Sequence, residues 1–269
     1  MMTIQDKVVI VTGASSGIGK ALAVELVKKE AKVVMAARNV EKLEEIQQSI
    51  DKDKNRTIIV RTDVTDESSC KNLIEESVAQ YGRIDVLINN AGISMRALFS
   101  EVDLDVLKKL MDTNFWGMVY CTKYALPHIE KSSGSIAAIS SIAGYKGLPG
   151  RTGYSASKFA MHGFIETLRI ELLNKNVHVL LACPGFTNTN IRKIALNDKG
   201  NTQGESPLDE SKVMPAAKVA VKIITAIERK KRDLILSSRA MLWANKWWPK
   251  WIDKKVYNMF AKENDPLLK

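Results

Sequence analysis

The chain has 269 residues, of which 45% are hydrophobic and 26% charged, enough to bury a sizeable core in one α/β domain. Its three cysteines, Cys70, Cys121 and Cys183, are isolated and odd in number, which argues against a disulfide framework or a cysteine metal site and favours a reducing compartment. The net charge of +10 admits nucleic acid, acidic lipid or a phosphorylated ligand, but from Arg229 onward eleven bases face only four acids, so the rest of the chain is near electrical balance.

Short runs rich in β-branched residues alternate along the chain with longer helical patterns. The strand-like runs are 7–13, 31–37, 56–60, 84–89, 134–140, 177–183 and 233–237. The helical patterns lie near 17–30, 40–50, 66–81, 103–130, 152–174 and 215–230. Continuous apolar strands are typical of parallel sheets covered on both faces, so we predict an α/β fold with a doubly wound, seven-stranded parallel sheet and helices on both faces. Ligands of such sheets bind at the carboxyl ends of the strands.

The first predicted strand runs directly into a glycine-rich turn and a helix. The segment "TGASSGIG" places Gly13, Gly17 and Gly19 between the two elements. Glycines let the backbone turn tightly and approach a pyrophosphate, whose charge the amide groups at the helix N-terminus then meet. The strand before and the helix after are the context that a dinucleotide site requires, although the spacing G-x-x-x-G-x-G differs from the usual G-x-G-x-x-G.

A second candidate lies in "GYSASKFAMHGF" (153–164), where Tyr154 and Lys158 are four residues apart and share one helical face. Such a pair alone is usually a surface contact. Its chemical interpretation is that the ammonium favours the phenolate and brings the pKa of the tyrosine, ordinarily about 10, toward the working range of a base. His162, one turn beyond Lys158, is interpreted as a packing or interface residue rather than an acid or base.

Two regions interrupt the alternation. Residues 186–214 are polar, contain Gly, Asn and Pro, and follow a strand end, so we expect a mobile substrate lid. Residues 239–269 form a C-terminal extension rich in Trp and Lys, in which Pro249 should kink or divide any helix. This extension could cover the substrate entrance, pack in the core or a subunit interface, or lie against an acidic membrane surface. We assign residues 1–238 to a single domain.

Four motifs in order identify a family resemblance: "TGASSGIG" (12–19), "NNAG" (89–92), "SSIAGYKGLPGRTGYSASK" (140–158) and "PGFTNT" (184–189). From residue 7 to about 236 the chain resembles the short-chain dehydrogenases/reductases, and it looks most like their dehydrogenase/reductase member-7-type branch. The resemblance implies a Rossmann fold and an oxidoreductase that interconverts a small-molecule carbonyl and a secondary alcohol by hydride transfer. It also implies a homodimer or homotetramer formed through the helices at 103–130 and 152–174.

The resemblance assigns four catalytic residues and no metal. Tyr154 would be the proton donor or acceptor, and Lys158 would supply charge and bind the nicotinamide ribose. Ser141, thirteen residues before the tyrosine, would hold the substrate oxygen. Asn114 would keep a water beside the lysine and complete a proton relay; the alternative for Asn114 is a helix kink or a satisfied core amide.

The second strand ends at Ala37 and is followed by Arg38, which can bind a 2′-phosphate, so NADP(H) is favoured over NAD(H). The alternative is a solvated arginine at a helix start. The residue before Gly17 is Ser16 rather than a basic residue, so Arg38 would act with Ser15, Ser16 or Asn39. By resemblance, the cofactor-binding residues are Gly13, Ser15, Ser16, Gly17, Ile18, Gly19, Arg38, Asn39, Asp63, Val64, Asn90, Ala91, Gly92, Tyr154, Lys158, Pro184, Gly185, Thr187 and Thr189. Asp63 could equally be a helix cap or a turn residue.

The expected pocket walls are mainly apolar, which favours a hydrophobic substrate. They are Met95, Leu148, Phe186, Ile191 and Ile194. The alternative function is a dinucleotide-binding regulatory or scaffold protein with a membrane- or partner-binding basic tail. Nucleic acid is not expected as a partner, because no nucleic-acid motif accompanies the charge. The N-terminus has no signal-like pattern and no run of about 18 uncharged apolar residues occurs, so we expect a cytoplasmic protein, with peripheral membrane contact as an alternative for the tail.

Overall fold

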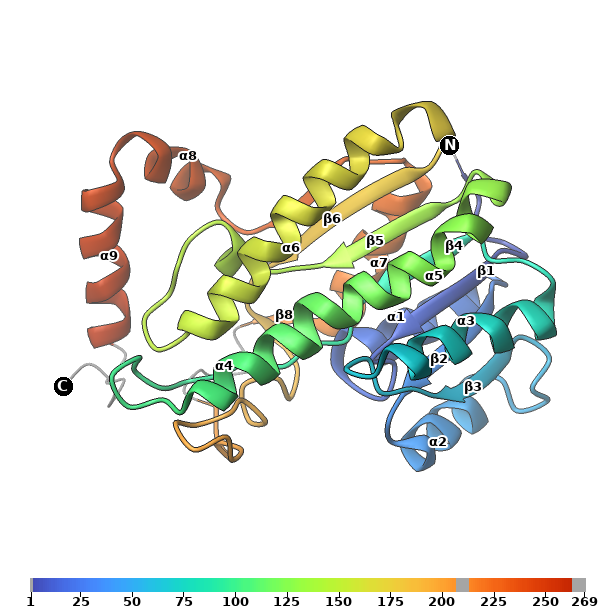
Figure 1. The fold of residues 1–269 in the computed structure, drawn as a ribbon, viewed down its shortest axis with the longest axis horizontal. Coiled ribbons are helices and arrows are strands. Elements are labelled where there is room, and N and C mark those ends of the chain that lie inside the picture. Colours follow the sequence, from blue (N-terminus) through green and yellow to red (C-terminus); the bar gives the residue numbers. More distant parts are fainter. Residues whose placement is uncertain (1, 207–212, 263–269) are drawn as a thin grey trace.

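The computed structural model describes residues 2–206 and 213–262 and contains one large parallel sheet with strand order β3-β2-β1-β4-β5-β6-β9 (Figure 1). The seven predicted strands are all present. Their bounds are β1 (Val8–Thr12), β2 (Lys32–Ala37), β3 (Thr57–Arg61), β4 (Val86–Asn89), β5 (Ser135–Ile139), β6 (His178–Pro184) and β9 (Asp233–Leu236). The predicted doubly wound α/β fold is therefore confirmed, and the strands' apolar composition follows from their burial on both faces.

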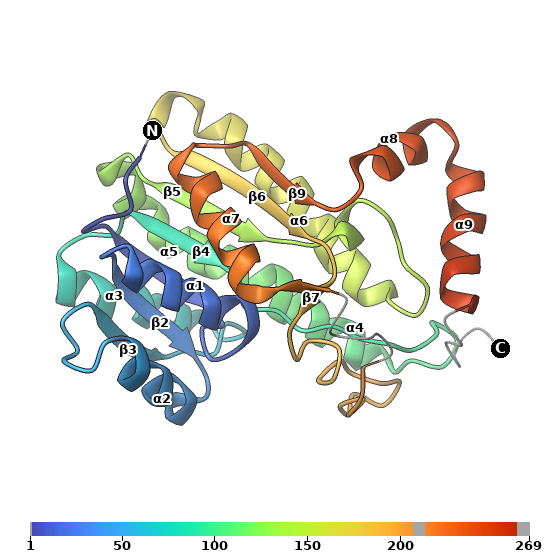
Figure 2. The same ribbon diagram turned by 180° about the vertical axis from the view of Figure 1, so that it is seen from behind.

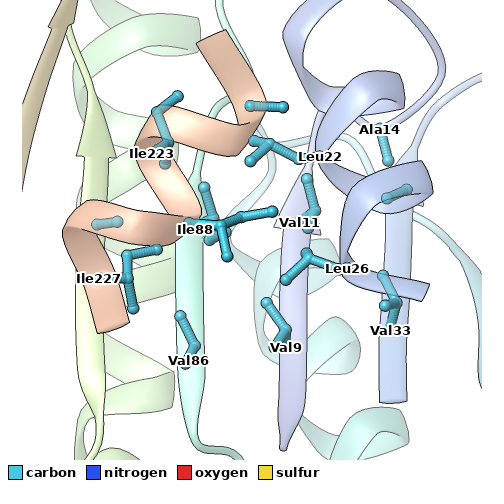
Figure 3. Packing of buried hydrophobic residues seen from close by; sticks show 14 of the residues in the cluster. Val9, Val11, Ala14, Leu22, Leu26, Val33, Val86, Ile88, Ile223 and Ile227 are labelled. Atoms are coloured by element: carbon cyan, nitrogen blue, oxygen red, sulfur yellow. The ribbon is translucent and has the colours of Figure 1, made fainter. Parts of the chain in front are cut away.

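Helices cover both faces of the sheet. Their bounds are α1 (Gly17–Lys28), α2 (Val40–Ile50), α3 (Glu67–Tyr81), α4 (Leu104–Met111), α5 (Gly117–Ser132), α6 (Thr152–Glu171) and α7 (Ala216–Glu228). On one face, Leu22 and Leu26 of α1 and Ile223 of α7 pack over Val11 and Ile88 (Figure 3). On the other face, α3, α5 and α6 cover the side chains that alternate with these. The two cores hold the sheet rigid between them.

The chain reverses its direction of travel across the sheet at β1. From β1 it moves outward to β2 and β3, then crosses back so that β4 pairs with the other edge of β1. The carboxyl ends of β1 and β4 therefore lie side by side while the helices that follow them leave on opposite faces. This is the switch point at which doubly wound sheets bind ligands.

The helix predicted over 103–130 is interrupted. The structure has α4, then a π-helical turn at Asp112–Trp116, then α5. A π turn inserts one extra residue into the helix, and such insertions occur frequently at functional sites. Because the hydrophobic period of the sequence is hardly altered by one residue, the pattern predicted a continuous helix.

The segment expected to form a lid, 186–214, contains little regular structure. Strand β7 (Thr187–Asn188) pairs with β8 (Met214–Pro215), and Leu196 bridges to Met95 and to Thr202. Residues 207–212 of this segment lie outside the described residues. The segment therefore has fixed anchor points at Leu196 and β7; its mobility stays a prediction.

The C-terminal extension forms two helices at one end of the molecule, α8 (Arg239–Trp247) and α9 (Pro249–Lys262) (Figure 2). Pro249 begins α9, so the predicted division of the helix at this proline is confirmed. Ile252, Val256 and Phe260 of α9 are buried against Leu148, Met241 and Ala244. None of the helices in the described part of the chain is long and apolar enough to cross a membrane.

We predict that a buried carboxylate beside β1 stabilises the sheet. Asp85 is 1% exposed, accepts a hydrogen bond from the Val8 amide at 3.0 Å, and pairs with Arg83 at 2.6 Å. Asp85→Ala leaves the Val8 amide without its side-chain acceptor, and we expect it to lower the free energy of unfolding by about 2 to 3 kcal/mol. Thermal unfolding should record a midpoint lower by roughly 5 to 10 °C.

Asp105→Ala is the matched control, because its ion pair with Lys108 is largely exposed and should contribute little to stability. Equal unfolding midpoints for the two variants would contradict the role of Asp85.

Candidate active site

A cleft opens at the carboxyl end of the sheet, above the junction of β1 and β4. Its lining comes from the loops that follow β1, β2, β3, β4, β5 and β6, together with α6. All of the residues expected to bind cofactor or to act in catalysis line this cleft except Gly19 and Asn114. The topology thus brings motifs more than 170 residues apart in sequence to one place.

The glycine turn between β1 and α1 depends on the absence of side chains. Gly13 and Gly17 have φ values of 68° and 55°, which other residues adopt only at a cost. A Cβ on Gly19 would lie 2.2 Å from the Gly13 carbonyl oxygen and 2.6 Å from Nδ2 of Asn90. Gly19 therefore does not line the cleft but lets α1 close onto the turn and onto the segment after β4.

The segment after β4 is tied to β1 by Thr12 and Asn90. Thr12 Oγ1 accepts hydrogen bonds from the amides of Asn90 and Ala91 at 2.9 and 3.0 Å. Asn90 Nδ2 donates to the Thr12 carbonyl at 2.9 Å. These bonds fix residues 90–92 along the floor of the cleft.

Tyr154 is buried and faces Ser141, with which it forms a side-chain hydrogen bond. Burial raises the pKa of Tyr154 above its ordinary value; the bond with Ser141 and the charge of Arg151 oppose this shift but do not reverse it. The expectation that Lys158 brings this pKa below the ordinary value is therefore wrong for the protein's own groups. Burial dominates, the groups that lower this pKa are Ser141 and Arg151 rather than Lys158, and Tyr154 is a neutral phenol able to donate a proton.

Lys158 lies on the next turn of α6, with Nζ 5.8 Å from the centre of the Tyr154 ring. It is 4% exposed and donates to the Ile139 carbonyl at 3.0 Å. Burial lowers the pKa of Lys158 to about 8. The ammonium is thus still mostly charged at neutral pH, in a site from which water is largely excluded.

Asn114 projects from the π-helical turn into the protein. Its Oδ1 accepts from the Ile93 amide at 2.8 Å, and its Nδ2 donates to the Ile93 carbonyl at 3.0 Å and to Ser157 Oγ at 2.9 Å. Asn114 therefore has the contacts of a satisfied core amide at a helix irregularity, which was the alternative considered for it. It also lies beside Lys158: a Cβ on Gly92 would be 3.1 Å from Asn114 Oδ1 and 3.7 Å from Lys158 Nζ.

Arg38, Asn39 and Asp63 form the outer end of the cleft. Arg38 has a side chain 68% exposed, 4.0 Å from the carboxylate of Asp63. Asp63 makes a turn, accepting from the amide and hydroxyl of Thr65, and despite burial these bonds and the neighbouring arginines lower its pKa. Asn39 caps α2 through the Lys42 amide at 2.8 Å. Of these three side chains, Arg38 is held least tightly.

The inner end of the cleft differs from the apolar wall that was expected. Leu148, Phe186, Ile191 and Ile194 line it, but Met95 does not. Met95 is fully buried because it packs in a hydrophobic cluster with Leu110 and Tyr154.

Polar residues missed in the sequence complete this wall: Ser94, Arg151 and Arg192. Arg151, at the start of α6, donates to Ser94 Oγ at 2.6 Å, and Arg192 donates to the Thr187 carbonyl at 2.8 Å. The position of Arg151, three residues before Tyr154, was a signal that it could share the tyrosine's surroundings.

His162 contacts groups beneath the cleft rather than in it. Its Nε2 lies 2.8 Å from Ser140 Oγ, and its ring packs edge-on against Tyr145. Burial lowers its pKa to about 4, so it is neutral at physiological pH. Within residues 2–206 and 213–262, no group of three or more His, Cys, Asp or Glu could hold a metal ion.

Comparison with known proteins accounts for this arrangement. The family model "short chain dehydrogenase" matches residues 7–200. A Drosophila melanogaster protein named dehydrogenase/reductase SDR family protein 7-like is 37% identical over 86% of this chain and 72% of its own length. The 11-beta-hydroxysteroid dehydrogenase A of Sesamum indicum is 35% identical over 87% of this chain and 66% of its own length.

A solved structure with a similar fold carries the same family name. A short-chain dehydrogenase/reductase from Burkholderia phymatum, solved in complex with NAD, superposes with a TM-score of 0.82 at 23% identity, covering 95% of this chain and 97% of that one. The glycine turn, the Tyr154–Lys158 pair and these matches all indicate the same family. The chain belongs to the short-chain dehydrogenase/reductase family of oxidoreductases, and its relatives support placing it in the member-7-type branch.

Proposed function

We propose that the protein is an NADP(H)-dependent carbonyl reductase or alcohol dehydrogenase, with residues 1–238 as its oxidoreductase domain. The observation that carries the proposal is the buried phenol of Tyr154, hydrogen-bonded to Ser141 in the same cleft as the glycine turn and Lys158. A nicotinamide dinucleotide bound along this cleft would supply or accept the hydride. The turn at Gly13 and Gly17 leaves backbone rather than side chains to meet its phosphates.

The chain's own residues divide the remaining work. Ser141 holds the substrate oxygen beside Tyr154, whose neutral phenol gives its proton to that oxygen when a carbonyl is reduced. Lys158 then stabilises the phenolate electrostatically and holds the ribose hydroxyls. Asn114 keeps a water beside Lys158 for proton return and holds Ile93 and Ser157 in register. Alcohol oxidation uses the same groups in reverse.

The preference for NADP(H) rests on Arg38. Its guanidinium is exposed at the outer end of the cleft and lies at the limit of ion-pair distance from Asp63. It can turn to a 2′-phosphate with Ser15 and Ser16, which line the same wall. Ala37, before it, offers no carboxylate to bind a 2′-hydroxyl.

The substrate we propose is a hydrophobic ketone, aldehyde or secondary alcohol. Phe186 and Ile194 remain 43% and 44% exposed at the rim of the cleft, and Leu148 lies near them. An apolar ligand would cover these side chains. One relative is named a hydroxysteroid dehydrogenase, which fits an apolar substrate of considerable size.

We further propose that the protein is a homodimer or homotetramer built on α5 and α6. The π-helical turn that leads into α5 exposes Trp116, and α6 exposes Phe159 and Ile170; the three are 44%, 47% and 65% exposed. We predict a mass in solution that is two or four times 29.9 kDa, measured by sedimentation. Ile170→Asp should lower it because it buries a charge in the interface. Val221→Asp on α7 is the control; a monomeric parent would contradict the proposal.

We predict that Tyr154→Phe lowers turnover of a carbonyl panel with NADPH by on the order of 10² to 10⁴-fold, because no proton donor remains. NADPH binding, measured by fluorescence, should change by less than about twofold, since the phenol is not required to hold the phosphates.

Tyr124→Phe, on α5 and away from the cleft, is the control. Turnover by Tyr154→Phe near that of the control would refute the assigned role. NADPH binding without turnover of any carbonyl by the parent would favour the alternative of a dinucleotide-binding scaffold.

We predict that Arg38→Asp lowers the ratio of kcat/KM with NADPH to that with NADH by about 10 to 100-fold, because a charge-assisted contact with the 2′-phosphate becomes a repulsion. Steady-state kinetics with both cofactors gives this ratio. Arg61→Asp places the same charge change near Asp63 but outside the cleft lining. An equal shift in both variants would mean that Arg38 does not select the cofactor.

A further inference from the structure

The C-terminal helices present an outward face that combines indoles and ammonium groups. Trp243, Trp247, Trp248 and Trp251 are each between 56% and 61% exposed. Exposed lysines lie among them, and we refer to this set as the Trp–Lys surface, made up of Trp243, Lys246, Trp247, Trp248, Lys250, Trp251, Lys254 and Lys255. Four of the chain's five tryptophans are therefore on one exposed segment, which is unusual for so large and apolar a side chain.

The indoles are gathered rather than scattered. The rings of Trp243 and Trp248 meet edge to face with centroids 5.8 Å apart, joining α8 to the start of α9. Lys246 lies over the Trp247 ring at 5.9 Å, and Lys255 lies over the Trp251 ring at 5.0 Å. The Trp–Lys surface is thus continuous across the turn between the two helices.

The rest of the extension holds this surface outward. Ile252, Val256 and Phe260 anchor the opposite face of α9 in the protein. Asp253 pairs with Lys146 of the loop beneath. Both helices lie at one end of the molecule, beyond β9 and away from α1 and α3 (Figures 1 and 2). The Trp–Lys surface is therefore exposed at one end of the molecule, where a large partner can reach it.

The charge of the surface favours an anionic partner. Residues 239–262 contain six bases and one acid, and that acid is the one paired with Lys146. A second copy of the chain would fit poorly, because a two-fold contact would bring the same lysines face to face. Indoles beside lysines are instead the combination that favours the boundary of an acidic membrane, where the ring enters the headgroup region and the ammonium meets lipid phosphate.

We propose that the Trp–Lys surface of α8 and α9 docks the protein peripherally on anionic membranes. The indoles supply apolar contact, and the lysines supply attraction to acidic headgroups that weakens with salt. This proposal does not rest on the proposed reaction and is tested without measuring catalysis.

The test uses sedimentation of the full chain with vesicles of phosphatidylcholine alone or mixed with phosphatidylserine. We expect binding to the mixed vesicles and at least about tenfold less to the neutral ones or at high salt. Lys250→Glu with Lys255→Glu, and separately Trp247→Ser with Trp251→Ser, should each weaken binding about tenfold or more. Lys222→Glu on α7 and Phe99→Ser, an exposed ring in the loop before α4, are the matched controls and should bind as the parent does.

A second measurement guards against variants that fail to fold. Circular dichroism and the thermal unfolding midpoint show whether each variant is folded. In addition, the Trp116→Phe variant retains only the four tryptophans of the tail, so its tryptophan fluorescence reports on the tail alone. In that variant, brominated phosphatidylcholine in anionic vesicles should quench the emission strongly.

Three results would overturn the proposal. One is the absence of a preference for anionic vesicles. Another is equal binding by tail and control variants, or binding without quenching. The third is a folded tail variant that changes the oligomeric mass, or retention on DNA, without any effect on vesicles, which would assign the surface to a second copy or to nucleic acid.

Discussion

The close approach of two backbones at the ends of β1 and β4 is the constraint on which the cleft depends. Gly19 lets α1 close on the Gly13 carbonyl, and Thr12 and Asn90 bond the two strand ends to each other. With no side chain between them, the amides at the start of α1 face the same space as residues 90–92. The rest of the cleft is built outward from this junction: β5 and β6 extend the sheet beside β4, and α6 packs on that part of the sheet.

Burial acts on both Tyr154 and Lys158, and in the same sense. It raises the pKa of Tyr154 and lowers that of Lys158, so each is driven toward its uncharged form. A phenol that keeps its proton is suited to donate it, whereas an ammonium close to its pKa can release a proton in turn. The low-dielectric surroundings disfavour the charged forms of Tyr154 and Lys158, and for the same reason they suit the two groups to proton transfer.

Much of the fold and part of the site were predictable from the sequence. Seven runs rich in β-branched residues predicted the strands, because a strand buried on both faces has a continuous apolar sequence. The glycine spacing and the Tyr154–Lys158 pair predicted residues that line the cleft. The π turn at Asn114 could not be seen, since one inserted residue hardly changes a helical period. Arg151 lies inside the 140–158 motif but at a position to which no chemical role was assigned, and Arg192 belongs to no motif. Met95 was misplaced because the sequence did not show that it packs in a buried cluster. The predicted direction of the Tyr154 pKa shift was wrong because the spacing of Tyr154 and Lys158 can be read from the sequence, whereas the degree of burial cannot.

Leu148 belongs both to the wall of the cleft and to the apolar cluster beneath α9. The loop that carries it runs between Ser141 and Tyr154, the two hydroxyl-bearing residues to which we assign the proposed chemistry. The extension is therefore a buttress for this wall of the cleft. Substitutions at Ile252, Val256 or Phe260 can reach the cleft through Leu148 without altering any residue of the glycine turn at its other end.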